Sequence, residues 1–500
     1  MKNIKYISLI LIVLLSQSCT DLVEEPKGQL APEGFFKTPE DVEAAINGAY
    51  AEWVTTQVEK EYFLALMLRS DMVDIGDRNT SGDRIALNDF SMDANNNLIR
   101  QTWIRLYQSI SAANTAIKAA RNIEADADVK NELEAKARFI RAFTYFHLVR
   151  AFGNVPYLDE PIESSEAFDA ITQTSSEVIY DMIIDDLIYC KANLPVAHQS
   201  GTRNLGTQGA AITLLADVYL TREMFADAAD EARSIINNTA SFDYSLASNY
   251  QDLFNASIVR NLKEPIFTYE LKNTLNQGSY NQADGMINLT RIRDMAARSL
   301  SVAVPSLEVY NSWDDRDYRK AVSFEDSVMI NGVQTALVET NIRVPRPHIA
   351  KYFRYPGPQE AGDDRSSDHL YHMYRYADVL LIAAEAIAES EGATPEAIGY
   401  VNEIRARARF NGVSTSTYPE DVSATITDED FIDVVREERR LEFAFEFKRW
   451  YDLKRWGILN EAFEGSGALE PHTVDDGRDY LFPLPQIEVD VTGFKQNDGY

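Results

Sequence analysis

The sequence predicts a mainly α-helical protein in which helix pairs pack against a loop-rich region with a few short strands. Apolar residues from Phe225 to Ile236 recur at helical spacing, which is typical of an amphipathic helix. The stretch before it, from Ile212 to Tyr219, has the same period. Between about 239 and 368 the period is lost among Gly, Asn, Ser and Pro residues. That segment is therefore predicted to form loops and brief strands.

The start of the chain has the composition of a secretory signal. Two lysines precede an apolar run at residues 7–15, and Cys19 follows a short polar stretch. A helix needs about 20 apolar residues to cross a bilayer, so this run is too short to be a membrane span. We predict a lipoprotein-type signal peptide over residues 1–18 and lipidation of Cys19. Ser16 stands where such signals usually carry Leu, and the alternative is an ordinary signal peptide that contains a Cys.

The remaining composition limits the partners of the protein. Residues 19–30 are acidic, contain Pro and have little apolar surface, so we expect an extended tether. The whole chain has 78 acidic and 48 basic residues and a net charge of −30. This charge repels phosphate backbones and argues against a nucleic-acid partner. Cationic ligands and neutral, hydroxyl-rich ligands are compatible with it.

A first helical part is predicted over residues 31–238. Residues 103–117 carry an apolar stripe, and residues 130–152 are apolar on most sides of a helix, so the second helix is expected to be buried. Residues 209–238 match a tetratricopeptide unit, with Ala232 in place of an aromatic residue and without the closing Pro. Helix pairs of this type bury their apolar faces against neighbouring pairs.

A second part is predicted over residues 239–500, loop-rich first and helical afterwards, and packed with the first part as one body. Residues 265–269 have the composition of a short strand. Residues 370–388 make a helical stripe that is followed, after a Pro, by a second stripe at 398–404. Acidic residues begin and basic residues end the segment 428–456, which predicts a long helix, broken once.

The chain lacks the familiar signatures of catalysis and cofactor binding. G-x-S-x-G, H-E-x-x-H, G-x-G-x-x-G and the phosphate loop do not occur, and no catalytic residue, cofactor or metal is predicted. His369 and His372, expected at a helix start, lack a third ligand. Residues 93–97 begin like a calcium loop, but Leu98 stands where Gly is needed, so a loop that caps the next helix is favoured. Cys190, surrounded by apolar residues, is interpreted as a small buried hydrophobe.

Several motifs, in a fixed order along the chain, resemble the SusD/RagB family. They are WIRLY at 103–107, AN at 113–114, FGNVPY at 152–157, RYADVLL at 375–381, AEA at 384–386, EERRLEF at 437–443, RWYDL at 449–453, FPLPQIE at 482–488 and QNDGY at 496–500. Leu484 replaces a usual Ile and Asp498 a usual Pro. The resemblance extends over essentially the whole mature chain.

This resemblance implies a SusD-like helical fold and a lipoprotein of the outer membrane, facing the cell exterior in Bacteroidota-type cells. Such proteins bind oligosaccharides, or peptides in some relatives, and cover a SusC-like TonB-dependent transporter as a lid. They are not enzymes. A peptide ligand, and a transporter-associated scaffold without its own ligand, are the alternatives within the same fold. The acidic residues after Cys19 are similar to the export signal of such lipoproteins.

Ligand contacts are expected on loops. A pyranose ring presents a C–H face and a rim of hydroxyls, so a site needs a flat aromatic residue together with amide, carboxylate or guanidinium groups. The stretches 69–84 and 273–284 supply such groups. The predicted contacts are Arg78, Asn79, Tyr280, Asn281 and Trp313. For Trp313, a core position is an equal alternative to a stacking platform.

Other charged and aromatic residues of the motifs are interpreted as architecture. Trp103, Trp450 and Trp456 are expected in the core. Partly buried ion pairs that orient helices are expected from Arg375, Glu385, Arg405, Glu438 and Arg439. The Asp314-Asp315-Arg316 turn is also interpreted as structural.

Overall fold

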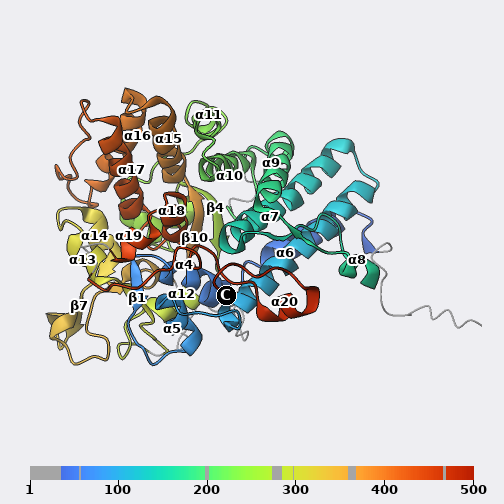
Figure 1. Cartoon of the computed structure of the whole chain (residues 1–500). Helices are drawn as coiled ribbons and strands as arrows, with labels where there is room; N and C mark the ends of the chain where they lie inside the picture. Colours follow the sequence, from blue (N-terminus) through green and yellow to red (C-terminus); the bar gives the residue numbers. More distant parts are fainter. Residues whose placement is uncertain are drawn as a thin grey trace, which may run out of the picture.

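The computed structural model is mainly helical, with short strands confined to a loop-rich region, as the sequence predicts (Figure 1). It describes residues 35–55, 58–197, 202–272, 284–296, 298–357, 367–464 and 469–500. The predicted signal peptide, Cys19 and the tether lie outside these residues. Within them, no helix is both long and apolar enough to cross a membrane.

The structure contains both long and short helices in its described residues. Their bounds are α3 Pro39–Ala51, α4 Leu64–Leu68, α5 Gly82–Asn88, α6 Asn97–Asn122, α7 Ala127–Phe152, α8 Ser165–Asp169, α9 Ser176–Asn193, α10 Gln208–Thr221, α11 Phe225–Ile236, α12 Gly285–Thr290, α13 Leu307–Ser312, α14 Tyr318–Ser323, α15 Tyr376–Glu391, α16 Pro395–Ala408, α17 Asp428–Glu442, α18 Arg449–Arg455, α19 Leu459–Glu464 and α20 Gln486–Thr492. A continuous row runs from α6 through α7, α9, α10 and α11 to α15, which also contacts α16 and α17.

Local sequence signals explain where these helices begin. Thr207, Thr394 and Thr427 each precede a helix, and each side-chain oxygen accepts a hydrogen bond from a backbone N–H in the first turn. Such N-caps satisfy donors that have no partner inside the helix. Asn96 does the same for α6, with its side chain accepting from Leu98 N at 3.1 Å. The loop at 93–97 therefore caps a helix, as the sequence predicts.

The predicted tetratricopeptide unit is confirmed as the antiparallel pair α10 and α11. Ala228, Ala232 and Ile235, which define the apolar stripe, are buried. The turn between the helices includes Glu223 at φ 57°. Next to this pair, α7 is buried over most of its circumference, in agreement with its sequence.

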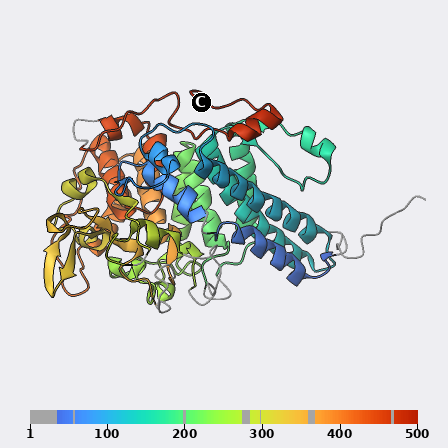
Figure 2. The ribbon, with the colours of Figure 1, turned by 90° about the horizontal axis from the view of Figure 1, so that it is seen from below.

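The strands form two-stranded antiparallel pairs in the described residues. These are β1 Val73–Ile75 with β5 Ala303–Pro305, β2 Val155–Pro156 with β3 Gln173–Thr174, β4 Pro265–Glu270 with β10 Leu370–Arg375, β6 Phe324–Glu325 with β9 His348–Ile349, and β7 Ser327–Ile330 with β8 Val333–Ala336. Most of them belong to residues 239–375, and the segment that includes β7 and β8 lies at one end of the molecule, away from α6 and α7 (Figure 2).

One predicted helix is too long. The apolar stripe at 370–388 was expected to be helical throughout, but residues Leu370–Arg375 form β10 and the helix begins at Tyr376. The strand pairs with β4, and both faces of its first residues are buried, so its apolar pattern does not separate strand from helix. His369 and His372 therefore do not lie at a helix start. Both are buried, and their Nε2 atoms contact the carbonyls of Tyr352 at 2.7 Å and Leu253 at 3.0 Å.

The predicted helix at 428–456 is broken once, between α17 and α18. Phe445 and Phe447 lie in the break at φ 67° and 65°, a conformation that costs free energy for a residue with a side chain. Both rings are buried, and Phe447 stacks on Phe63 with the ring centroids 4.5 Å apart. Core packing of these rings offsets the backbone cost.

The predicted ion pairs are confirmed, and several are completely buried. Arg375 Nη1 lies 2.7 Å from Glu264 and 2.5 Å from Glu442, while its Nε lies 3.0 Å from Glu446. The other predicted members pair as Glu385 with Arg455, Arg405 with Glu438, and Arg439 with Asp452. They connect α15, α16, α17 and α18 where these helices meet.

Candidate ligand-binding site

A surface formed by loops around β1 and β5 includes the first two predicted contacts, Arg78 and Asn79. Antiparallel pairing places Val73 opposite Pro305 and Ile75 opposite Ala303. At Gly76 the two chains approach so closely that a Cβ atom would lie 2.6 Å from the carbonyl oxygen of Ser301. Only Gly is accommodated there without a shift of the backbone. The backbone at 76–79 is thereby held against the loop that follows α12.

Asp77 fixes this loop surface. Its side chain is nearly buried, and its Oδ2 lies 2.5 Å from Arg293 Nη1 and 3.0 Å from Arg343 Nε. Its Oδ1 accepts a hydrogen bond from the backbone N–H of Asn79 at 2.9 Å. Two guanidinium groups from distant loops therefore converge on the residue that precedes Arg78.

Arg78 and Asn79 are both exposed, as a contact residue must be. The side chain of Arg78 is 54% exposed although it pairs with Asp89, and the two groups are 2.5 Å apart. An exposed pair of this kind contributes little to folding and leaves guanidinium N–H groups accessible. The side chain of Asn79 adds an amide donor and acceptor beside them.

The other predicted contacts have different outcomes. Tyr280 and Asn281 lie outside the described residues. Trp313 ends α13 and is only 2% exposed, packed edge to face against Phe324 at 5.3 Å. It offers no open ring face, so the core alternative applies and the stacking platform was the wrong interpretation.

Arg69 and Asp71, in the same predicted stretch, form internal ion pairs instead of facing solvent. Arg69 is completely buried and donates to the Asp479 carboxylate at 3.0 Å and to its carbonyl at 2.7 Å. Asp71 accepts two hydrogen bonds of 2.8 Å from Arg449. Both residues therefore connect the first part of the chain to its last 60 residues. Within this stretch, Arg78 and Asn79 are the predicted contacts that the structure leaves exposed.

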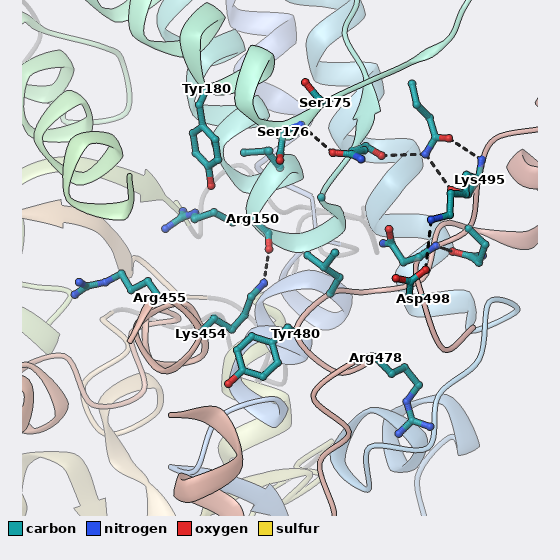
Figure 3. Close-up of a pocket in the computed structure, with 18 of the residues that line it drawn as sticks. Arg150, Ser175, Ser176, Tyr180, Lys454, Arg455, Arg478, Tyr480, Lys495 and Asp498 are labelled. Carbon is teal, nitrogen blue, oxygen red and sulfur yellow. Dashed lines mark hydrogen bonds and ion pairs between the residues drawn. The ribbon is translucent and has the colours of Figure 1, made fainter. Parts of the chain in front are cut away.

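A larger hollow lies elsewhere, where α7 ends (Figure 3). This end pocket has a volume of about 880 Å³. Its walls come from the C-terminal turn of α7, the start of α9, helix α18 and the segments 476–481 and 495–498. The volume lies within the roughly 300–1,000 Å³ of typical small-ligand sites.

The rim of the end pocket is fixed by amides. Gln173 donates to the carbonyls of Asn154 and Lys495, and its own Oε1 accepts from Lys495 N at 2.6 Å. Asn497 donates to the carbonyls of Phe152 and Phe482 at 2.9 and 2.7 Å. The C-terminal segment is thereby attached to α7 and β3, and the pocket has a preformed wall.

Cations outnumber carboxylates in the lining of the end pocket. Among the described residues that line it, the cations are Arg150, Lys454, Arg455, Arg478 and Lys495, and the acids are Asp476 and Asp498. Two of the cations are neutralised by carboxylates that do not line the pocket, because Arg455 pairs with Glu385 and Arg478 with Asp479. Lys495 is 84% exposed and lies 3.5 Å from Asp498.

Arg150 and Lys454 are less well neutralised. Lys454 Nζ donates to the Arg150 carbonyl and lies 4.1 Å from the ring centroid of Trp450. Burial, and the nearby guanidinium of Arg150, lower the pKa of Lys454 below its ordinary value. The nearest carboxylate to Arg150 is Asp217 at 3.8 Å, which is long for an ion pair.

The sequence did not predict the end pocket, although several residues that line it belong to recognised motifs. Gly153, Asn154, Gln496 and Asn497 belong to the family-like motifs, and the side chains of the last three make hydrogen bonds that connect segments of the fold. The available signal was the run Lys454-Arg455 together with Arg150 in a strongly acidic chain. Their convergence depends on the packing of α18 against α7, which no local pattern predicts.

Among the described residues, no group of three or more His, Cys, Asp and Glu side chains is arranged to hold a metal ion. Cys190 is buried and donates to the Ala135 carbonyl at 3.2 Å. The described residues thus form a mainly helical protein with packed helix pairs, an exposed loop surface and an end pocket.

Comparison with known proteins identifies the family. Residues 311–500 match the SusD family, and residues 24–220 match a family described as "Starch-binding associating with outer membrane". SusD-like protein P2 of Formosa agariphila is 43% identical over 98% of this chain and 97% of its own length. The chain therefore belongs to the SusD family.

Solved structures agree with this fold. A SusD homologue from Bacteroides thetaiotaomicron superposes with a TM-score of 0.81 at 21% identity, covering 94% of this chain and 98% of the homologue. Surface glycan-binding protein A from the same organism, solved in complex with laminarihexaose, has a TM-score of 0.73 at 19% identity and covers 92% of this chain and 99% of its own.

Proposed function

We propose that this protein is a surface lipoprotein that captures oligosaccharides and passes them to a SusC-like TonB-dependent transporter of the outer membrane. The observation that carries the proposal is the relationship to SusD-like protein P2 over nearly the whole chain. The described binding of laminarihexaose by a structural relative supports a glycan as ligand. The family description, starch-binding and associating with the outer membrane, supports the location.

The loop surface supplies chemistry that suits a sugar. Arg78 and Asn79 present guanidinium and amide groups to solvent from a backbone that Asp77 holds in place. Such groups match the alternating donors and acceptors of a pyranose rim. Tyr280 and Asn281, which lie outside the described residues, are proposed as an aromatic and an amide contact of the same ligand.

Isothermal titration calorimetry with a panel of plant and host oligosaccharides, both neutral and acidic, tests the proposal. We expect a heat of binding with at least one glycan and unchanged glycan length after incubation, because the proposed role is binding without cleavage. The double variant Arg78→Ala, Asn79→Ala is expected to weaken that binding about tenfold or more, since hydrogen bonds to a charged group are worth about 1.5–3 kcal/mol.

The control is Arg316→Ala, which also removes an exposed Arg that pairs with a neighbouring Asp. It is expected to leave the affinity unchanged. Binding of mixed cationic oligopeptides without any glycan would instead assign a peptide ligand, which the net charge of −30 permits. Co-purification with a transporter barrel and no ligand in either panel would favour a scaffold.

A further inference from the structure

The end pocket is unusual because its charge opposes that of the whole molecule. The chain has a net charge of −30, yet cations outnumber acids among the described residues that line the pocket. Charges farther apart than about 8 Å are largely screened at physiological ionic strength. The electrostatic potential at a ligand inside the pocket is therefore set by the charges that line the pocket and not by the net charge of the chain.

Lys454 and Arg150 are the cations with the weakest internal neutralisation. The ammonium group of Lys454 contacts a carbonyl oxygen and the face of Trp450, neither of which carries a full negative charge. Arg150 packs its guanidinium over the rings of Phe146 and Tyr451, at 3.6 and 3.9 Å from their centroids. A buried charge of this kind is costly unless a counter-charge is supplied.

The pocket also provides surfaces for the neutral part of a ligand. Tyr180 lines the wall on α9, and Figure 3 shows its hydroxyl directed toward the side of the pocket where Arg150 lies. Burial raises the pKa of Tyr180 to about 12, so it remains a neutral donor and acceptor at physiological pH. Tyr480 lines the opposite wall, beside Lys454.

We propose that the end pocket binds an acidic sugar residue of an oligosaccharide, with its carboxylate or sulfate ester held by Lys454 and Arg150. The rim cations Arg478 and Lys495 would attract the same charge at the entrance, and Tyr180 and Tyr480 would border the ring. This inference deepens the proposed function, because it rests on the ligand being a glycan and names its chemical class. The proposed acid-binding pocket is a different site from the loop surface around Arg78.

Calorimetry on the full-length protein with matched ligand pairs provides the test. One arm compares oligogalacturonate with its fully methyl-esterified form, and a second compares a sulfated galactan oligosaccharide with its desulfated form. We expect at least one acidic member to bind and its neutral counterpart to bind at least about tenfold more weakly, as charge-assisted hydrogen bonds predict. The arm that responds identifies carboxylate or sulfate.

Two variants place the binding in the pocket. Lys454→Gln retains a donor for the Arg150 carbonyl but removes the charge, and it is expected to weaken acidic-glycan binding about tenfold. Lys495→Glu reverses an exposed charge at the entrance, so it will fold even if Lys454→Gln does not, and about threefold weaker binding is expected. The control Lys263→Glu makes the same charge change at a residue that does not line the pocket.

The outcomes separate this inference from the proposed function. Binding of a neutral glycan with no response to any acidic ligand would overturn the acidic pocket and leave the proposed function standing. Acidic-glycan binding that is equally weakened by Lys263→Glu and Lys495→Glu would also overturn it, because the effect would then be general electrostatics. Absence of binding to every glycan, neutral or acidic, would overturn both.

Discussion

At the scale of residues, the most consequential side chain is Arg375. It is completely buried and contacts the carboxylates of Glu264, Glu442 and Glu446. Arg407 and Lys351 share these carboxylates. The acids and bases neutralise one another, which is the condition under which buried charges are tolerated.

Replacement of Arg375 with Gln is expected to destabilise the fold by about 3–5 kcal/mol, because it removes a buried positive charge that Glu264, Glu442 and Glu446 all contact. Urea unfolding followed by tryptophan fluorescence measures the change. The matched control is Arg316→Gln, at an exposed pair with Asp314, which should change the free energy of unfolding by no more than about 1 kcal/mol. Equal effects of the two variants would contradict the role given to the buried network.

The same network predicts acid sensitivity. Burial alone would raise the pKa of Glu446, but the charges of Arg375 and Lys351 outweigh it and lower the pKa to about 2 from an ordinary 4.5. A lowered folded-state pKa contributes stability above the unfolded-state value and loses it as the pH falls toward the folded-state value. We therefore expect the urea midpoint to fall between about pH 4.5 and pH 2, and a constant midpoint over that range would contradict this assignment.

Individual residues were predicted unevenly from the sequence. Ion pairs were predicted for Arg375 and for Glu385, Arg405, Glu438 and Arg439, because unpaired charges among packed helices would be costly. Their partners were not predicted, since Glu264 and Glu442 meet Arg375 from segments more than 60 residues away. The burial of Trp313 was equally hard to predict, because it depends on packing against Phe324, which begins β6 eleven residues later in the chain.

At the scale of elements, the helices were predictable and the connections were not. The amphipathic period indicated the pair α10 and α11 and the buried helix α7. The N-cap and the acidic first turn indicated where α17 begins. The segment at 370–375 has an apolar pattern that fits both strand and helix, and only its pairing with β4 excludes the helix. The end pocket was missed for a related reason: it lies between elements, and its wall is the C-terminal segment.

Two glycines at different elements should respond in opposite directions to the same substitution. A Cβ at Gly206 would lie 2.6 Å from the ring of Phe139, which is completely buried in α7. Gly206→Ala is therefore expected to destabilise the protein by about 1–3 kcal/mol. Gly399, inside α16, has no atom within 4 Å of such a Cβ, so Gly399→Ala should stabilise it by about 0.5–1 kcal/mol.

Thermal and urea unfolding of the two Ala variants measure this contrast. Each variant adds one methyl group, so the difference between them isolates the contact with Phe139 from the general effect of replacing Gly. A neutral or stabilising effect of Gly206→Ala would show that the close approach of the loop at 206 to α7 is not a constraint on stability.

At the scale of the whole molecule, the main hydrophobic core of the described residues extends from Val42 to Phe494, and a smaller cluster contains Tyr250 and Phe254. It includes residues of both predicted parts of the chain. The proposed lipid at Cys19 would attach this body to a membrane through the acidic tether. Two or more acyl chains are needed for stable anchoring, as the resemblance to bacterial lipoproteins implies.

Cys19→Ala is expected to release the protein from the membrane fraction, because it removes the attachment point of the proposed acyl chains. Cell fractionation followed by immunoblotting measures the distribution. The control Cys190→Ala removes a buried thiol instead and should leave the protein with the membranes. Persistence of the Cys19 variant in membranes of cells that lack the transporter partner would argue against a lipid anchor.

The contact between Arg69 and Asp479 has a further consequence for how the chain is divided. A fragment that ends near residue 238 would contain a completely buried guanidinium without the carboxylate that neutralises it, and its complement would expose the opposite charge. Neither half would be an autonomous folding unit. Separately expressed halves should be insoluble alone and recover a single cooperative unfolding transition when they are refolded together.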